Sequence, residues 1–203
     1  MTKQPHETEI KLAVGDVASA KKLLYRAGFR VYKRRLFEDN TMFDTADLKL
    51  RESAMAFRVR DAGGKATVTF KGKPVPGKHK SREELEVKVS DGATMRTIAS
   101  RLGFVPVFRY QKYRTEYKLA KGSGIATLDE TPIGVFLELE GQPAWIDRLA
   151  RKLGFTEQDY ITRSYGGLYL EWRKRNPKAP QDMLFKQGAR VQSSTSQQSR
   201  ARQ

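Results

Sequence analysis

The sequence contains no cysteine and no long apolar run. Without cysteine the chain can form no disulfide bond, no thiolate metal site and no cysteine nucleophile. No apolar stretch approaches the ~18 residues that a membrane-spanning helix needs. The opening segment MTKQPHETEIKL also lacks the apolar core of a secretory signal. These absences predict a cytoplasmic protein without a membrane segment.

Histidine and phosphate-loop motifs are also scarce. Only His6 and His79 are present, and neither is placed as a metal ligand. His79 falls in the polar loop KGKPVPGKHKS, where we expect it to be exposed to solvent. The glycine-rich phosphate loop that ends in Lys-Ser or Lys-Thr is absent.

The length of 203 residues fits one domain of ordinary size with a tail. Hydrophobic residues make up 38% and aromatic residues 10% of the chain. That content is enough for a packed core, so disorder of the whole chain is excluded. The last stretch, VQSSTSQQSRARQ, is polar and low in complexity. We therefore predict a folded domain over residues 1–175 and a basic, Ser/Gln-rich, disordered tail over residues 176–203.

Positive charge is in large excess, with 39 Lys and Arg against 23 Asp and Glu and a formal net charge of +16. Such a balance implies an anionic partner, which is nucleic acid, a phosphate-rich small molecule or an acidic surface. Residues 172–203 contribute +7 of this charge, so the rest of the chain keeps +9. That body is rich in acids as well as bases. We therefore expect nucleic-acid binding at most weakly, through the tail.

A pattern of strand, helix and Gly-Phe occurs three times. Each copy begins with a Glu-x-Glu strand (ETEIKLAV, REELEVKV or FLELEG) and continues into a stretch with apolar residues at helical spacing. Each copy then reaches a Gly, which suits a left-handed residue just past a helix, and a Phe that can make the hydrophobic contact of that cap. We predict helices that begin at Asp16, Asp91 and Pro143 and end just before Gly28, Gly103 and Gly154.

The predicted strands alternate apolar and charged side chains. In ETEIKL, Glu7, Glu9 and Lys11 share one face and Ile10 and Leu12 the other. The segments AFRVR, TVTFKGK, REELEVKV, RYQKYRTEYKL and VFLELE repeat the pattern. Two structures fit it: a half-solvated antiparallel sheet with its charges outward, and a closed eight-stranded barrel with its charges inward. Because full charges fill nearly all of the polar positions, we favour the barrel, with helices over its apolar outer face.

A barrel with a charged interior needs a ligand or pairing for those charges, since buried charges are otherwise costly. Its bases suit phosphate oxygens; they are Arg58, Arg60, Lys71, Lys73, Arg82, Lys112 and Arg114. Its carboxylates suit a hard divalent cation, Mg²⁺ or Mn²⁺; they are Glu7, Glu9, Glu84, Glu86, Asp129, Glu138 and Glu140. Together the two sets predict a site for a polyphosphate or a nucleoside triphosphate.

These motifs, taken in order, resemble the CYTH superfamily, also called triphosphate tunnel metalloenzymes, over nearly all of residues 6–170. ETEIKL resembles the opening Glu-x-Glu-x-Lys signature, and TVTFKGK the strand with a phosphate-binding Lys. SREELEVKV, FRYQKYRTEY, LDETPIGVFLELEG and TRSYGGLYL resemble the later strands and the closing Ser-Tyr helix. The family includes class IV adenylyl cyclases, thiamine and inorganic triphosphatases, and fungal-type RNA triphosphatases. The resemblance implies an α+β fold: an eight-stranded antiparallel closed barrel flanked by helices.

The resemblance also implies a role for individual residues. The phosphate-binding residues would be Lys11, Arg58, Arg60, Lys71, Lys112 and Arg114, with Lys73 and Arg82 as further liners. The metal ligands would be Glu7, Glu9, Glu138 and Glu140, with Asp129 as a supporting or second-metal group. The candidate catalytic set is Lys11, Glu84, Glu86 and Asp129. Arg163, just before Ser-Tyr, either closes over phosphate or is an exposed helix residue. The loop 72–81 is either a gate or a simple hairpin connection.

Two reactions use the same charges. Water that attacks the terminal phosphorus gives a triphosphatase, whereas a ribose 3′-hydroxyl that attacks the α-phosphorus gives cyclic AMP and pyrophosphate. Because Glu138 and Glu140 complete a multi-carboxylate set, we favour hydrolysis of inorganic, nucleoside or thiamine triphosphate, with adenylyl cyclase as the alternative. A non-catalytic binder of polyphosphate or RNA is a more distant alternative, and its binding would weaken steeply with salt. Either a monomer or a homodimer fits the sequence.

Overall fold

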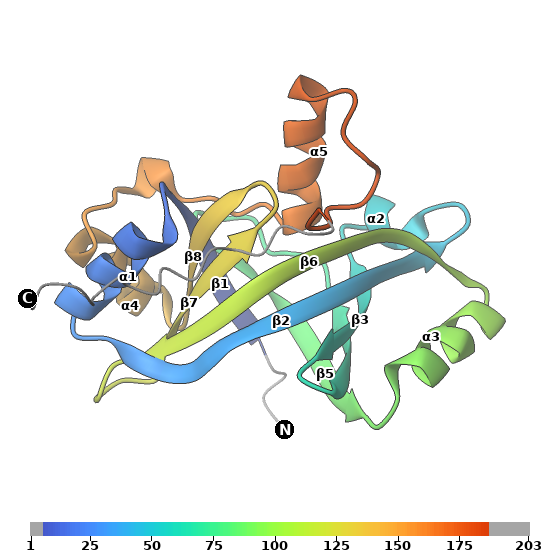
Figure 1. Cartoon of the computed structure of the whole chain (residues 1–203), viewed down its shortest axis with the longest axis horizontal. Helices are drawn as coiled ribbons and strands as arrows, with labels where there is room; N and C mark the ends of the chain where they lie inside the picture. Colours follow the sequence, from blue (N-terminus) through green and yellow to red (C-terminus); the bar gives the residue numbers. More distant parts are fainter. Residues whose placement is uncertain (1–5, 187–203) are drawn as a thin grey trace, which may run out of the picture.

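The structure, a computed structural model, describes residues 6–186 and contains a closed barrel of eight antiparallel strands. In chain order the strands are β1 (His6–Val14), β2 (Arg30–Thr45), β3 (Ala56–Ala62), β4 (Lys65–Lys71), β5 (Lys80–Val89), β6 (Phe104–Lys118), β7 (Ile125–Thr131) and β8 (Gly134–Glu140). Around the barrel they follow the order β1-β5-β4-β3-β2-β6-β7-β8 (Figure 1). The predicted α+β barrel is therefore confirmed.

Strand pairing places the charged faces inside the barrel. Lys11 of β1 lies opposite Glu138 of β8, and Arg114 of β6 lies opposite Asp129 of β7. Residues that face each other across a strand pair point to the same side of the sheet. The charged positions of neighbouring strands therefore meet within the barrel, and the half-solvated sheet with outward charges is not what forms.

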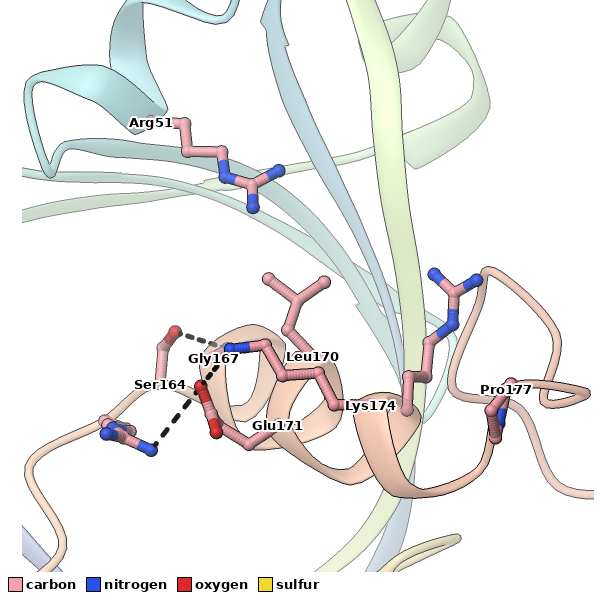
Figure 2. Close-up of a pocket in the computed structure, with 9 residues that line it drawn as sticks. Arg51, Ser164, Gly167, Leu170, Glu171, Lys174 and Pro177 are labelled. Atoms are coloured by element: carbon pink, nitrogen blue, oxygen red, sulfur yellow. Dashed lines mark hydrogen bonds and ion pairs between the residues drawn. The ribbon is translucent and has the colours of Figure 1, made fainter.

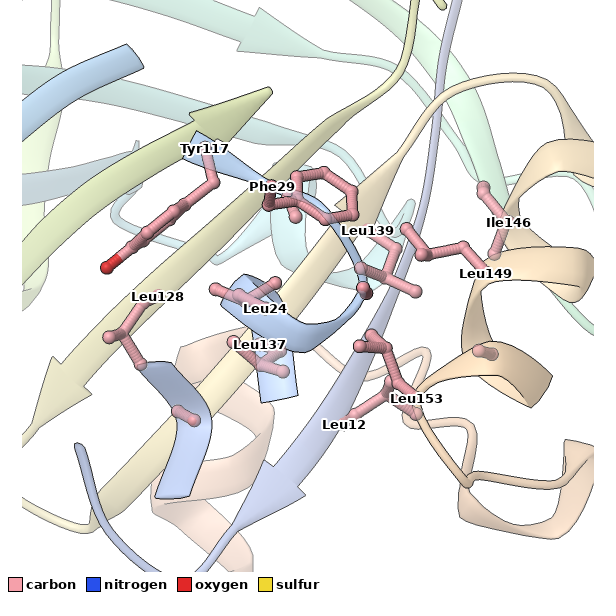
Figure 3. Packing of buried hydrophobic residues seen from close by; sticks show 14 of the residues in the cluster. Leu12, Leu24, Phe29, Tyr117, Leu128, Leu137, Leu139, Ile146, Leu149 and Leu153 are labelled. Carbon is pink, nitrogen blue, oxygen red and sulfur yellow. The ribbon is translucent and has the colours of Figure 1, made fainter. Parts of the chain in front are cut away.

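The main apolar core lies outside the barrel, between the strands and two helices. Helices α1 (Val17–Arg26) and α4 (Pro143–Lys152) cover β1, β7 and β8 (Figures 1 and 3). Leu12 and Leu139 of the sheet are fully buried in one cluster with Leu24 of α1 and Ile146 of α4. Each buried Leu or Ile contributes ~1.5–3 kcal/mol relative to exposure. This layer lets the barrel turn its apolar face outward without exposing it to water.

The repeated Gly-Phe pairs end the helices as predicted. Gly28 after α1 and Gly154 after α4 have φ of +93° and +90°, a backbone region that only glycine adopts at no steric cost. The N–H groups of Phe29 and Phe155 each donate to the carbonyl five residues earlier, at 3.0 Å. The helix of the remaining copy is α3 (Gly92–Arg101), and its Ala99 packs against β2 and β3. All three predicted helices are therefore present.

Helix α5 (Tyr165–Arg175) packs Tyr165 and Tyr169 against Tyr110 and Phe136 of the barrel. The chain then returns to β6, where Met183 is fully buried and its backbone bonds the strand at 2.9 and 3.0 Å. The predicted tail over residues 176–203 therefore begins with a packed segment, and the boundary at residue 175 falls inside folded structure. The rest of that tail, including VQSSTSQQSRARQ, lies outside the described residues.

The length of β2 and the short helix α2 (Lys49–Glu52) are not evident from the sequence pattern. Residues 30–37 of β2 are exposed throughout. Apolar and polar side chains do not alternate along this segment, so its sequence does not mark it as a strand. Their partner is β6, which pairs with β2 along almost its whole length. Within residues 6–186, every helix is too short or too polar to cross a membrane.

Candidate active site

The barrel interior brings together most of the residues that the sequence singles out. Ion pairs join Glu7, Glu9, Lys11, Arg58, Arg60, Lys71, Glu84, Glu86, Lys112, Arg114, Asp129 and Glu138. Arg82 of β5 lies directly opposite Glu7 of β1. These side chains divide into two groups that differ in how completely they are paired.

The first group is a set of closely paired charges. Lys11 Nζ lies 3.0 Å from Glu9 Oε1 and 3.1 Å from Glu138 Oε1. Arg114 binds Asp129 with two hydrogen bonds of 2.6 and 2.7 Å and also contacts Glu138. We call this group the paired network; its members are Glu9, Lys11, Glu38, Arg60, Lys80, Lys112, Arg114, Asp129 and Glu138.

Asp129 is the centre of the paired network. Its side chain is completely buried, and it accepts hydrogen bonds from Lys112 Nζ at 2.8 Å and from the Tyr165 hydroxyl at 2.7 Å, besides those from Arg114. Burial, and then the negative charge of Asp129, raise the pKa of Tyr165 well above its usual range, so the hydroxyl keeps its proton. Helix α5 is thereby tied to the barrel interior through Tyr165.

The second group is less completely paired. Lys71 Nζ lies 2.6 Å from Glu7 and 2.8 Å from Glu84. Arg58 donates to Thr69 Oγ1 at 3.0 Å but lies 3.9 Å from Glu84 and 3.8 Å from Glu86. We call this group the arginine cluster; its members are Glu7, Arg58, Lys71, Arg82, Glu84 and Glu86.

Two guanidinium groups of the arginine cluster are buried without full pairing. Arg58 and Arg82 are each 8% exposed, and the Nε atom of each has no hydrogen-bond partner. Among residues 6–186, Arg82 has no ion-pair partner. A buried charged donor without an acceptor costs folding free energy. An anion with several oxygens would supply the missing acceptors.

In the paired network, neighbouring opposite charges shift the pKa values of Glu138, Lys11 and Glu38 in the direction that favours ionisation. Burial alone would raise the pKa of Glu138, but Arg114 and Lys11 outweigh it and hold the pKa well below its usual range. Burial would likewise lower the pKa of Lys11, but Glu138 and Glu9 raise it. In Glu38, burial is outweighed by Lys112 and Arg60, so its pKa falls to about 2. Glu138, Lys11 and Glu38 therefore stay charged across the physiological range.

In and near the arginine cluster, the pKa values of the carboxyl groups are shifted in both directions. Burial, and then the neighbouring charge of Glu9, raise the pKa of Glu7 to about 8. Burial opposes ionisation of Glu84 as well, but a hydrogen bond from Glu7 and the charge of Lys71 lower its pKa to about 2. The pKa of Glu140 is also raised, by the protein that surrounds its carboxyl group at the exposed end of β8 and by the charge of Glu9. Two neighbouring carboxyl groups thus hold their protons with very different strengths, a division that is typical of acid–base pairs.

The carboxylates match a hard divalent cation in donor chemistry. They offer oxygen ligands only, which is the donor chemistry that such a cation prefers. In residues 6–186, however, no three His, Asp or Glu side chains are arranged so that they could hold a metal ion. Glu9 and Glu138 are turned to Lys11 instead. Metal binding by these residues therefore requires their amine partners to move toward another anion.

Four predicted residues lie at the margin of the site or outside it. Glu86 is 45% exposed at its side chain, and Glu140 is exposed at the end of β8. Lys73 is exposed beyond the end of β4. Arg163 is 62% exposed and lies 3.9 Å from Glu171 of α5. Arg163 also lines a pocket on the outer side of α5 with residues shown in Figure 2, and its closing over phosphate stays a prediction.

Sequence reasoning missed three interior residues, Glu38, Lys80 and Tyr165. Lys80 is 8% exposed and donates to Glu9 at 2.8 Å. It occurs two positions before Arg82, so the alternation of β5 would have found it if the strand had been extended into the loop. Glu38 alternates with Asn40 on β2, but a single acid and a neutral amide are a weak signal. Tyr165 was noted only as part of a helix motif.

The prediction that His79 is exposed was wrong. Its side chain is 9% exposed, and Nε2 lies 2.7 Å from Asp147 of α4. Lys78 also binds Asp147 at 2.9 Å, and the Tyr160 hydroxyl donates to the same carboxylate at 3.1 Å. The loop between β4 and β5 is thus attached to α4. The Pro/Gly-rich sequence around His79 indicated a loop. It could not show that helix α4 lies against this loop.

Comparison with known proteins extends the sequence resemblance. The family model described as "CYTH domain" matches residues 5–165. A Methanocaldococcus jannaschii protein named as a candidate adenylate cyclase is 38% identical over 170 residues, which cover 78% of this chain and 95% of that protein. The PH1819 protein of Pyrococcus horikoshii has a similar structure, with a TM-score of 0.69 and 27% identity over 82% of this chain and 99% of that one.

A more distant structure has the same fold. A Hippeastrum protein, described as a candidate adenylyl cyclase with a dominant triphosphatase activity, superposes with a TM-score of 0.59 and 21% identity. The alignment covers 86% of this chain and 97% of that one. At this identity the likeness concerns the fold alone.

Proposed function

The chain belongs to the CYTH domain family, and we propose that it is a divalent-metal-dependent enzyme that binds a triphosphate inside its barrel and hydrolyses it. The substrate is inorganic triphosphate or a nucleoside or thiamine triphosphate. The observation that carries this proposal is the pair of buried, incompletely paired guanidinium groups of Arg58 and Arg82. They supply buried, positively charged donors that the oxygens of a multiply charged anion would satisfy.

The bases of both groups would hold the phosphates. Arg58 and Arg82 are the least committed to carboxylates and would bind first. Lys71, Arg60, Lys112, Arg114 and Lys11 line the rest of the interior. When phosphate oxygens draw the bases away, the carboxylates lose their amine partners. Phosphate binding and metal binding should therefore favour each other.

The freed carboxylates would hold the cation. Glu7, Glu9, Glu138 and Glu140, with Asp129 as a supporting group, are the residues that would ligate Mg²⁺ or Mn²⁺. When bound, such an ion polarises phosphoryl oxygens and neutralises the charge that develops on them. Glu7 must give up a proton to become a ligand, because burial and Glu9 raise its pKa to about 8.

Within the candidate catalytic set, the residues differ in what they can do. Glu84 is ionised beside Lys71 and can accept a proton from an attacking water molecule. Lys11 is suited to neutralising charge on phosphate oxygens. Asp129 has its oxygens occupied by three donor residues, which suits the positioning of Lys112 and Arg114 more than chemistry on the substrate. Glu86 is half exposed and would act at the margin of the site.

Adenylyl cyclase activity is the second candidate, because the relative that is 38% identical is named as a candidate adenylate cyclase. Both reactions start from a triphosphate and a metal ion and differ in the nucleophile. Incubation with Mg²⁺ or Mn²⁺ and either tripolyphosphate or ATP, followed by product analysis, separates them. We expect tripolyphosphate to be cleaved to pyrophosphate and phosphate. Formation of cyclic AMP from ATP without cleavage of tripolyphosphate would overturn hydrolysis as the first choice.

A further inference from the structure

A second basic cavity lies outside the barrel, between α2 and α5 (Figure 2). Its volume is about 740 Å³, which falls in the range of small-molecule sites. Four of its lining residues are basic, namely Arg51, Arg163, Arg173 and Lys174, and one is acidic, Glu171. The cavity therefore has an excess of positive charge, and nothing in the proposed triphosphate chemistry uses it.

The cavity and the barrel interior lie on opposite faces of α5. Tyr165, Tyr169 and Trp172 pack toward the barrel, whereas Ser164, Gly167, Leu170 and Lys174 line the cavity. These two sets follow the three- and four-residue spacing of a helix and define separate stripes. The helix thus separates the two sites, and the cavity is not an extension of the barrel interior.

Two of the bases are left without acidic partners. Glu171 accepts a hydrogen bond from Lys174 at 3.1 Å and lies 3.9 Å from Arg163. Arg51 and Arg173 have no ion-pair partner among residues 6–186. Figure 2 shows Arg51 reaching from α2 toward α5 across the cavity. Guanidinium groups in this arrangement can bind phosphate oxygens in pairs.

The position of Arg51 is held by a buried carboxylate. Asp44 is 2% exposed, and it accepts hydrogen bonds from the N–H groups of Leu50 and Arg51, each at 2.9 Å. The residues that flank α2, Leu48 and Ala54, have φ of +58° and +56°, which side chains other than glycine rarely adopt. The short helix is therefore anchored in an unusual conformation that places Arg51 at the cavity.

Gly167 leaves the α5 side of the cavity open. A Cβ atom at this position would meet only Ser164 Oγ at 3.6 Å and Arg163 Cβ at 3.7 Å, both from residues that line the cavity. At Gly166, by contrast, a Cβ atom would contact Phe108 of the barrel at 3.4 Å. A larger side chain at residue 167 would therefore project into the cavity and not into the barrel.

We propose that this cavity is a second anion site, which binds a small oligophosphate such as pyrophosphate or a nucleoside diphosphate. The unpaired guanidinium groups of Arg51 and Arg173 bind the phosphates, and Leu170 and Pro177 offer an apolar contact for the remainder of a nucleotide. The size of the cavity fits a small molecule. The proposal is independent of the reaction inside the barrel.

Isothermal titration of the full-length protein with pyrophosphate, in EDTA and without divalent metal, tests this site. We expect two binding events in the wild type. The variant Arg51→Ala/Arg173→Ala should weaken one event at least about tenfold and leave the other unchanged. The control Arg101→Ala/Arg148→Ala removes the same charge from two exposed arginines far along the chain and should retain both events. Equal isotherms for the two double variants would overturn the site.

Two further variants assign each binding event to its site: Gly167→Leu, which leaves the net charge unchanged, and Arg82→Met, which removes one charge inside the barrel. Gly167→Leu should weaken the same event as Arg51→Ala/Arg173→Ala, because its side chain enters the cavity, and Arg82→Met should weaken only the other. Unchanged binding in Gly167→Leu, with thermal unfolding like that of the wild type, would also contradict the proposal. Repeating the titration with ADP identifies the ligand class: equal affinity means that phosphate alone is recognised, and tighter binding of ADP means that the apolar contact is used.

Discussion

The paired network and the arginine cluster occupy the same barrel interior but differ in how their charges are compensated. In the paired network, each acid lies close to at least one base, and Asp129 has donors from three residues. In the arginine cluster, Arg82 has no ion-pair partner among the described residues and Arg58 lies 3.8 Å or more from its carboxylates. The paired network is thus the more fully compensated of the two, with Glu38 Oε2 as its one buried polar atom without a hydrogen-bond partner among the described residues.

This difference indicates that the charges of the paired network stabilise the fold, whereas the incompletely paired bases of the arginine cluster are available to bind a ligand. A buried ion pair loses several kcal/mol when one partner is removed, because the other is left uncompensated. When a buried base that has no acidic partner is replaced, no carboxylate is left uncompensated. Stability and activity should therefore respond in opposite ways in the two groups, and the following experiments test that contrast.

The largest effect is expected for Asp129→Asn in the paired network. Loss of the charge leaves Lys112 and Arg114 with fewer carboxylates and should lower the free energy of unfolding by about 3–5 kcal/mol. Urea unfolding measures it. The matched control is Asp47→Asn, whose carboxylate is exposed beside Lys49 and whose loss should leave the free energy of unfolding nearly unchanged. Similar stabilities for the two variants would show that the network is not structural.

Arg82→Met should show the reverse behaviour. Since no acid is orphaned, we expect a free energy of unfolding equal to or above that of the wild type. Turnover of tripolyphosphate should fall by about 10²–10³ in kcat/KM, the usual effect of losing one donor to a reacting group. Arg101→Met on the exposed end of α3 is the control. A loss of less than threefold would remove Arg82 from the site.

Glu7 of the arginine cluster and Glu38 of the paired network should also differ in how they make stability depend on pH. Glu7 has a folded pKa of about 8 against about 4.3 when unfolded. Its contribution is therefore present at low pH and is lost between about pH 4 and 8, by up to about 1.4 kcal/mol per pH unit. Glu7→Gln resembles the protonated form, so it should match the wild type near pH 4 and exceed its stability near pH 8.

Glu38→Gln in the paired network should behave in the opposite way. The folded pKa of Glu38 is about 2, so its contribution is present above about pH 4 and is lost as the pH falls toward 2. The variant should be less stable than the wild type by about 2 kcal/mol at pH 7 and approach it in acid. Parallel pH profiles for Glu7→Gln and Glu38→Gln would contradict the division of the interior.

The smallest effect is expected at the loop that borders the arginine cluster. Asp147→Asn weakens the contacts of the carboxylate with Lys78, His79 and Tyr160, which should loosen the loop between β4 and β5 by about 1 kcal/mol. Hydrogen exchange at the Val75 amide, which donates to Ser81 at 2.7 Å, should become about fivefold faster, with little change in global stability. Unchanged exchange would show that these contacts do not hold the loop.

Much of the barrel could be predicted because its signal is local. Alternation in ETEIKL or VFLELE identifies a strand and its two faces, and Gly-Phe pairs mark helix ends through the left-handed backbone that Gly28 and Gly154 adopt. The exposed first half of β2 carried no such signal. Lys80 was missed because it precedes the recognised part of its strand, and Arg163 was uncertain because a basic residue beside a helix can face either side of it.

Which residues carry charge and how they alternate can be read from the amino-acid sequence, and the CYTH resemblance adds that the charged faces meet in a closed barrel. The pairing of each charge with its partners becomes visible only in the folded barrel. Strand register brings Lys11 opposite Glu138 and Arg114 opposite Asp129, and it places Arg82 beside Glu7 without an ion pair of its own. The physical reason is that alternation is a property of neighbouring residues, whereas pairing across strands depends on residues that lie far apart in the chain.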